Sequence, residues 1–208
     1  MSFDVVLARM AQLQALFTPT AAPAAAPSTV SAATPVTPAS FASQLQSASS
    51  TATLTAPQPA SNAGQAIVNL VSKEVGVSEE PKGSNDSPRI AQYRQATAGS
   101  GVGPWCAYFT SWAARESGVP LGDNGQGFGR VDDVYAWAQK TGKAIPNTGS
   151  DVKPQPGDLI VWDEHIGVVE SVGSDGTINT IEGNSSDQVS KRSYPPGTRP
   201  AIGYVHLG

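Results

Sequence analysis

The stretch Pro104-Trp-Cys-Ala-Tyr-Phe-Thr-Ser-Trp-Ala-Ala-Arg-Glu-Ser-Gly118 contains the only cysteine of the chain, Cys106. Its apolar residues recur at spacings of three and four: Phe109, Trp112 and Ala113. This spacing predicts a helix over 105–117 with one buried face, and Gly118 is a typical helix stop. Cys106 falls in the first turn, where free backbone N–H groups and the helix dipole favour a thiolate. The stretch therefore predicts a nucleophilic cysteine at the start of a central helix.

Other interpretations of this stretch stay open. A lone cysteine is often a small buried hydrophobic residue rather than a nucleophile. A single cysteine also excludes a disulfide within the chain. Trp112 lies on the apolar stripe, where an aromatic residue more often packs in the core than contacts a substrate. Trp105 lies just outside the helix, and we expect it to line the cleft as a substrate-binding residue.

Composition divides the chain into three parts. Apolar residues at helical spacing predict an amphipathic helix over residues 1–17. Residues 18–62 are mostly Ala, Pro, Ser, Thr and Gln, and no charged side chain occurs between Arg9 and Lys73. Such a segment buries too little apolar surface to offset its ordering entropy, which predicts a flexible linker. Residues 63–208 suit a single domain of ordinary size.

Charge and hydropathy exclude two classes of partner. The formal net charge is −4 and the sequence pI is about 5.1. No stripe of Lys and Arg could release counterions from nucleic acid, so we expect no nucleic-acid partner. No apolar run reaches the length of a membrane span, which predicts a soluble protein. We also expect the protein to be a monomer and to need no cofactor.

Three further helices are predicted over 63–75, 88–96 and about 132–142. Asp132 and Asp133 could cap the third helix or bind a metal ion. Because no other ligands surround them, capping is the better interpretation. From Pro154 onward, short β-rich runs alternate with turns. These runs predict five strands, over 158–163, 165–172, 177–182, 188–194 and 201–207.

The five strands predict an antiparallel meander. Ser174-Asp-Gly176 is the clearest hairpin signal, and it places the strand of His165 beside the strand that ends in Glu182. Helices followed by strands predict an α+β architecture. In it, the helix that bears Cys106 packs on the sheet that bears His165.

Such packing would assemble a cysteine hydrolase. Cys106 would attack an amide carbonyl, while His165 would accept the thiol proton or pair as imidazolium with the thiolate, and later protonate the departing amine. Glu182 or Asn184 would bind the far imidazole nitrogen, as the third member of a triad does. A backbone amide near the helix start would stabilise the oxyanion.

Two other polar residues favour structural roles. His206 follows the last strand without a polar neighbouring strand, so we expect it at the surface rather than as the base. Asp158 lies in a Pro-Gly-Asp turn, where we expect its carboxylate to accept hydrogen bonds from nearby backbone amides.

Four short motifs occur in a single order: Trp105-Cys-Ala-Tyr-Phe109, Pro156-Gly-Asp-Leu159, His165-Ile-Gly-Val-Val169 and Glu182-Gly-Asn184. Together they resemble the CHAP domain, the cysteine- and histidine-dependent amidohydrolase/peptidase, over about residues 65–208. Residues 76–85 and the tyrosine-bearing helix after them also resemble the opening of CHAP domains in bacterial and phage wall hydrolases.

The resemblance implies a papain-like α+β fold and cleavage of amide bonds in peptidoglycan. It implies that Cys106 is the nucleophile, His165 the base, Glu182 the orienting acid and Asn184 a supporting polar residue. Some members bind calcium through an acidic loop before the cysteine. Here residues 98–105 contain no carboxylate, so we predict no such site.

The family leaves the reaction open between two amide bonds. An amidase would cut between the lactyl group of the glycan and L-alanine, and an endopeptidase would cut within the stem peptide or cross-bridge. The alternatives are a catalytically inactive wall-binding module and a papain-like protease that acts on proteins.

Residues 1–17 predict a docking element or an export signal, with a poorly ordered terminus as the alternative. Arg9 interrupts the short apolar stretch that follows Asp4, a pattern unlike an ordinary secretory signal. We therefore expect a wall-located protein that leaves the cell by a non-classical route, or a phage lysin that stays cytoplasmic until release. The partner of the helix would belong to a flagellar or phage apparatus.

Overall fold

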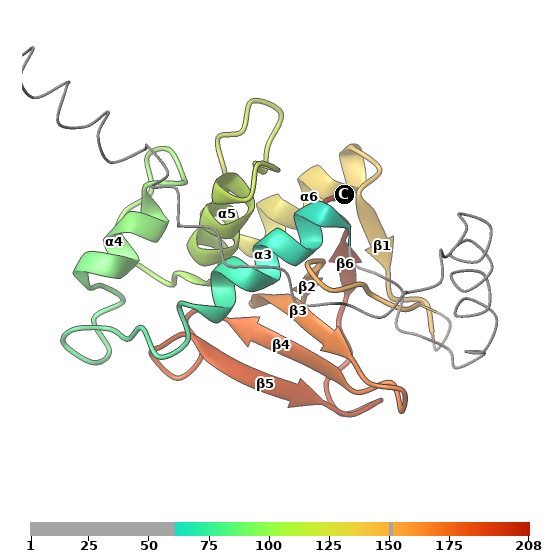
Figure 1. Ribbon diagram of the computed structural model, residues 1–208. Coiled ribbons are helices and arrows are strands. Elements are labelled where there is room, and N and C mark those ends of the chain that lie inside the picture. Colours follow the sequence, from blue (N-terminus) through green and yellow to red (C-terminus); the bar gives the residue numbers. More distant parts are fainter. Residues whose placement is uncertain (1–60, 150–151) are drawn as a thin grey trace, which may run out of the picture. The chain divides into compact units, whose positions relative to one another are not determined.

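The computed structural model describes residues 61–149 and 152–208, all within one compact unit. The predicted helix over 1–17 and nearly all of the predicted linker lie outside these residues. Within them, four helices precede or flank a six-stranded sheet (Figure 1). The α+β class is confirmed, and the arrangement is compatible with a papain-like fold.

Of the helices in the described residues, the first two begin at a serine cap, and the other two have no side-chain capping bond. The helices are α3 (Asn62–Ser72), α4 (Pro88–Arg94), α5 (Cys106–Glu116) and α6 (Val131–Lys140). The Ser61 hydroxyl accepts a hydrogen bond from the Gly64 N–H at 2.9 Å, and the Ser87 hydroxyl accepts one from the Ile90 N–H at 3.3 Å. Each bond satisfies a backbone donor that the first turn leaves free.

The expected capping of α6 by Asp132 or Asp133 is wrong. The N-cap is Arg130, which makes no side-chain capping bond, and both aspartates lie inside the first turn. In that position their carboxylates still interact favourably with the positive end of the helix dipole.

The sheet is antiparallel throughout, in the order β1-β6-β2-β3-β4-β5. Its strands are β1 (Ala144–Pro146), β2 (Leu159–Val161), β3 (Ile166–Val172), β4 (Ile178–Glu182), β5 (Ser190–Tyr194) and β6 (Gly203–Val205). Strands β2 to β5 form the first four strands of the predicted five-stranded meander, and the β3–β4 turn closes with a hydrogen bond from the Gly173 N–H to the Thr177 carbonyl. The fifth predicted strand, β6, does not continue the meander beside β5. The chain then returns so that β6 pairs with β2, and the unpredicted β1 extends that edge.

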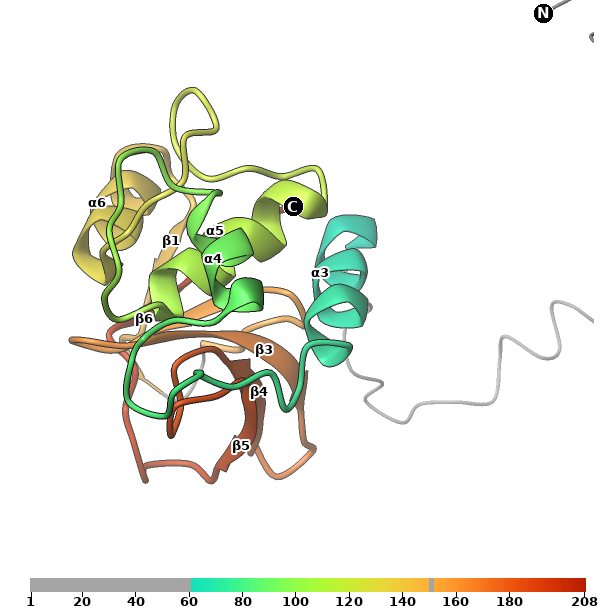
Figure 2. The same cartoon turned by 90° about the vertical axis from the view of Figure 1, so that its left-hand side faces the viewer.

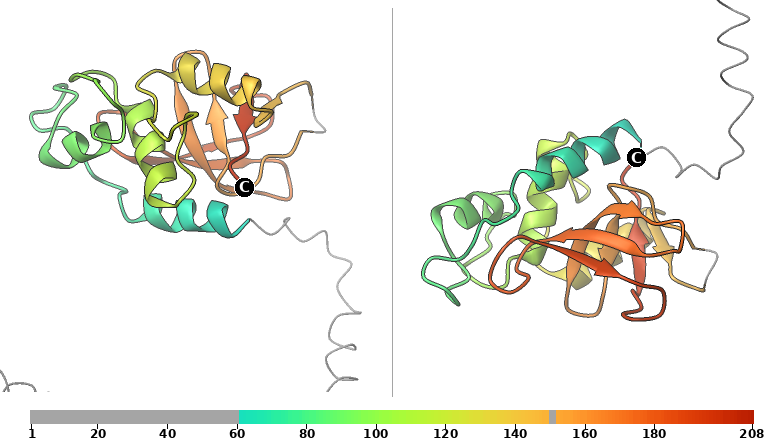
Figure 3. Two further views of the ribbon diagram at one scale, coloured as in Figure 1. Left: turned by 90° about the horizontal axis from the view of Figure 1, so that it is seen from above. Right: turned by 60° about the horizontal axis from the view of Figure 1, so that its bottom comes forward.

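The two faces of the sheet are covered differently. Along β2, Leu159 and Val161 pack in the main core, while Ile160 packs in a smaller cluster with Tyr204. Helices α3 and α5 contact β3, and α6 contacts β1. Figure 2 and the two views of Figure 3 place these helices on one side of the sheet, with α4 against α5. Helix α5 therefore lies between the sheet and α4.

Helix α3 approaches the turn before β2 very closely. Gly157 has φ +92°, and a Cβ built on it would overlap the Cα of Gly64. The close contact therefore requires glycine for space as well as for its backbone conformation.

We predict that Gly157→Ala lowers the free energy of unfolding by about 1–3 kcal/mol more than Gly197→Ala does. Gly197 is the matched control because it has φ +79° but open space around its Cα, so alanine there incurs only the conformational strain. The midpoints of urea unfolding measure the difference. Equal midpoints would mean that α3 moves away from the turn without cost.

Candidate active site

Cys106 is the first residue of α5 and is 5 % exposed. The first backbone bond of the helix runs from the Phe109 N–H to the Trp105 carbonyl, at 2.9 Å. The N–H groups of residues 106–108 therefore have no acceptor within the helix. The thiol lies beside these donors, at the positive end of the helix dipole.

His165 and Glu182 come together because β3 and β4 pair in antiparallel fashion. His165 immediately precedes β3, and Glu182 is the last residue of β4. The His165 Nε2 lies 2.8 Å from the Glu182 Oε2. On β3, a Cβ at Gly167 would lie 2.7 Å from the Glu182 Cγ, so glycine leaves room for the carboxylate.

The Glu182 carboxylate is fully occupied although it is only 1 % exposed. Its Oε2 pairs with His165, and its Oε1 accepts hydrogen bonds from the Thr180 hydroxyl at 2.6 Å and the Tyr194 hydroxyl at 2.9 Å. Three donors from three different segments thus fix its position. A buried carboxylate requires such partners.

The electrostatics favour a charged pair. Burial lowers the pKa of His165, but the interactions with Cys106 and Glu182 outweigh it and raise the pKa to about 9. Burial raises the pKa of Glu182, but the hydrogen bonds from His165, Thr180 and Tyr194 outweigh it and the net shift is downward. Since Nε2 faces Glu182, Nδ1 is the nitrogen left for Cys106. At neutral pH the site therefore contains an imidazolium between a carboxylate and the cysteine.

An aromatic wall covers the other side of His165. The ring of Trp162 stacks on the imidazole, with centroids 5.7 Å apart, and the Arg199 guanidinium lies 4.4 Å from the centre of the Trp162 ring. Arg199 also donates a hydrogen bond to the Tyr194 hydroxyl at 3.2 Å. The imidazole is thereby restrained in its plane by Trp162 as well as in rotation by Glu182.

Comparison with known protein families identifies the region that contains these residues. Residues 97–184 match the CHAP domain family model. The match includes the cysteine, the histidine, the glutamate and Asn184, and it confirms the predicted resemblance. No curated protein matches the chain.

Within the CHAP match, the geometry favours Glu182 over Asn184 as the partner of the imidazole. Asn184 lies just beyond β4 in a left-handed conformation, with φ 56°. Its side chain makes no hydrogen bond to another described residue. Asn184, two residues after Glu182, therefore makes no hydrogen bond to His165.

Trp105 lies elsewhere than expected. The sequence predicts it as a substrate-binding residue of the cleft, but its side chain is 0 % exposed and packs against Tyr93 and Phe109. Its indole N–H donates to the Glu79 carboxylate at 2.9 Å. The physical reason is this buried acceptor 26 residues earlier, which the local sequence does not reveal.

The side chains of His206 and Asp158 form a second histidine–carboxylate pair, which shares no residue with the His165–Glu182 pair. The His206 Nδ1 lies 2.7 Å from the Asp158 Oδ1, and the Asp158 Oδ2 accepts a hydrogen bond from the Gln155 N–H at 2.7 Å. Asp158 thus has the structural role that its turn predicts, and its bond to His206 was not anticipated. His206 remains partly exposed.

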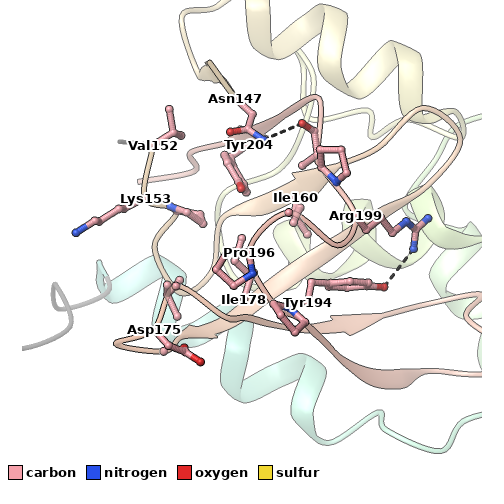
Figure 4. Close-up of a pocket in the computed structure, with 18 of the residues that line it drawn as sticks. Asn147, Val152, Lys153, Ile160, Asp175, Ile178, Tyr194, Pro196, Arg199 and Tyr204 are labelled. Atoms are coloured by element: carbon pink, nitrogen blue, oxygen red, sulfur yellow. Dashed lines mark hydrogen bonds between the residues drawn. The ribbon is translucent and has the colours of Figure 1, made fainter. Parts of the chain in front are cut away.

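The outer face of the sheet contains a hollow of about 1370 Å³, lined by Ile160, Ile178, Tyr194, Tyr204 and loop residues (Figure 4). Cys106, His165 and Glu182 do not line it, but Tyr194, which donates to the Glu182 carboxylate, does. Across residues 61–149 and 152–208, no three acidic, cysteine or histidine side chains are grouped as metal ligands. In the same residues, no helix has the length and hydropathy needed to cross a membrane.

We predict that Glu182→Gln lowers the pKa of His165 from about 9 toward or below its ordinary value of 6.5. The amide cannot stabilise the imidazolium by charge, so the opposing effect of burial weighs more. In the unmodified protein, His165 is protonated below its raised pKa and loses its proton as the pH rises through about 9. NMR titration of the imidazole resonances measures the shift.

The chain offers an internal control, because it has only two histidines. His206 lies against Asp158 rather than Glu182, so its resonance serves as the reference imidazole signal in both proteins. An unchanged His165 titration in the variant would contradict the role of Glu182.

Proposed function

We propose that this protein is a peptidoglycan hydrolase that cleaves an amide bond of the bacterial cell wall by cysteine nucleophilic catalysis. The observation that carries the proposal is the buried His165–Glu182 pair at 2.8 Å, within a CHAP match that also contains Cys106 at the start of α5. CHAP domains are hydrolase-like, and the arrangement supports amide chemistry because each role of a cysteine hydrolase has a residue.

Acylation begins from the thiolate–imidazolium pair. The Cys106 sulfur attacks the carbonyl carbon, and the oxygen that gains negative charge binds free N–H groups of the first turn of α5. The protonated His165 then donates its proton to the departing amine, the C–N bond breaks, and a thioester remains on Cys106. The neutral imidazole now accepts a proton from water, which attacks the thioester; a carboxylic acid leaves, and the Cys106 thiolate and the protonated His165 are restored.

Glu182 acts throughout by way of His165. Its charge stabilises the imidazolium, and its fixed Oε2 directs Nε2 so that Nδ1 faces the sulfur. Thr180 and Tyr194 keep the carboxylate in place while the imidazole changes charge. The base therefore returns to the same orientation after each proton transfer.

The proposed bond is the N-acetylmuramoyl–L-alanine amide or a peptide bond of the stem or cross-bridge. A wall substrate implies that the protein works outside the cytoplasm. Residues 1–17 remain the candidate for a docking or export element, with a flagellar or phage apparatus as its partner.

We predict that Cys106→Ala abolishes the release of soluble fragments from purified peptidoglycan without unfolding the domain. The methyl group replaces only the nucleophile, and loss of triad members typically costs about 10⁴–10⁶-fold in turnover. Mass spectrometry of the soluble products identifies the bond. Free stem peptides indicate an amidase, and new termini within the peptide indicate an endopeptidase.

The Cys106→Ala protein is the blank for every wall preparation, and its circular dichroism should equal that of the unmodified chain. Equal products from both proteins would disprove the nucleophile assignment. If no type of cell wall yields a Cys106-dependent product, the result favours a binding module or a hydrolase that acts on proteins.

A further inference from the structure

A second buried carboxylate lies outside the catalytic group. Glu79, in the segment between α3 and α4, is 5 % exposed. Its Oε1 accepts a hydrogen bond from the Trp105 indole N–H, and its Oε2 accepts one from the Asn85 backbone N–H, each at 2.9 Å. No lysine, arginine or histidine among the described residues forms an ion pair with it. Two directed hydrogen bonds are therefore its only strong partners in this part of the chain.

The first of these bonds acts on the residue that precedes the nucleophile. Trp105 is the N-cap of α5, and its carbonyl accepts the first backbone hydrogen bond of the helix. The indole stacks on Tyr93 with centroids 6.0 Å apart and is completely buried. Fixing the indole therefore fixes the peptide to which Cys106 is joined.

The backbone of the Glu79 segment is bound to the loop that follows the catalytic acid. The Glu79 N–H donates to the Asp187 carbonyl at 2.9 Å, and Ser78 forms a β-bridge with Gln188. Gly183, next to Glu182, lies against the Trp105 ring: a Cβ there would be 2.9 Å from the Trp105 Cζ3. Glu79 is thus bound both to Trp105 at the start of α5 and to the loop that follows β4.

We propose that Glu79 is a positioning residue that sets the orientation of the Cys106 thiol relative to the His165–Glu182 pair, through its bond to the Trp105 indole. Glu79 does not touch the reacting atoms, so its effect appears in the coupling between cysteine and histidine. The importance of this positioning for catalysis rests on the proposed function, but the coupling between Cys106 and His165 can be measured without any substrate.

The test is Glu79→Gln in the full-length chain. The glutamine amide has one acceptor oxygen for two donors, so either the indole N–H or the Asn85 N–H loses its acceptor and the contact between this side chain and the indole is no longer fixed at both oxygens. We expect iodoacetamide to alkylate Cys106 about 10- to 100-fold more slowly at pH 7, the size of effect that small misplacements cause. The pKa of His165 should also fall from about 9, because part of its shift comes from Cys106.

Trp105→Phe removes the indole N–H, and with it the hydrogen bond to Glu79, while an aromatic ring stays in the core. It should lower the alkylation rate and the His165 pKa in the same direction as Glu79→Gln. This second variant tests the inference independently if Glu79→Gln does not fold.

Glu74→Gln is the matched control. Glu74 is also a buried carboxylate, but it binds Arg89 and the Tyr93 hydroxyl rather than Trp105. Its loss should lower the urea midpoint while the alkylation rate stays within about twofold of the unmodified protein. If Glu79→Gln and Trp105→Phe behave like this control, with normal alkylation and normal His165 titration, Glu79 is only structural and the inference is overturned.

Activity gives a further readout if the wall is the substrate. Glu79→Gln should lower kcat while KM stays unchanged, because the substrate is bound but the nucleophile is misaligned. If no wall fragment depends on Cys106 but both variants still lower alkylation and the His165 pKa, the positioning role holds and only the proposed substrate fails.

Discussion

Burial of the Glu182 carboxylate is the constraint on which the arrangement of the sheet depends. A charge at 1 % exposure is stable only when its oxygens are hydrogen-bonded, and the donors come from β4, β5 and the residue before β3. Gly167 supplies the space for it on the neighbouring strand. The pairings of β3 with β4 and of β4 with β5 are therefore the same ones that orient the His165 imidazole.

The nucleophile reaches this pair because α5 packs closely on the sheet. Gly183 has no side chain, and a Cβ there would lie 2.6 Å from the Phe109 Cβ. This contact lets the first turn of α5 approach the end of β4. The buried aromatic residues Tyr93, Trp105 and Phe109 fill the adjoining core, so the helix cannot slide along its axis without opening a cavity.

Much of the site could be predicted because its signals are local. The helix start at Cys106, the hairpin after β3 and the order of cysteine, histidine and acid all follow from short patterns. The residues alone did not decide between Glu182 and Asn184, since the answer depends on where β4 ends: Glu182 is its last residue, and Asn184 lies beyond it in a left-handed conformation. Pairing by β1 was missed because three residues at a sheet edge carry no periodicity.

Trp105 and Glu79 illustrate the deeper limit. An aromatic residue beside a nucleophile is consistent with either a cleft or a core, and the deciding hydrogen bond joins residues 26 positions apart. Likewise, nothing in the turn-rich segment before α4 marks Glu79 as buried. Long-range contacts of polar side chains leave no trace in local hydrophobic patterns.

The position of β5 at the sheet edge has a consequence for how the protein loses activity. This strand pairs only with β4, exposes Lys191, Arg192 and Ser193, and ends in Tyr194, which donates to the catalytic acid. Edge strands open by local fluctuations that require less free energy than global unfolding. Each opening of the β5 end would leave a buried carboxylate oxygen with one donor fewer and release one restraint on His165. Opening of this edge strand alone therefore loosens the His165–Glu182 pair, without any change in the helices on the other side of the sheet.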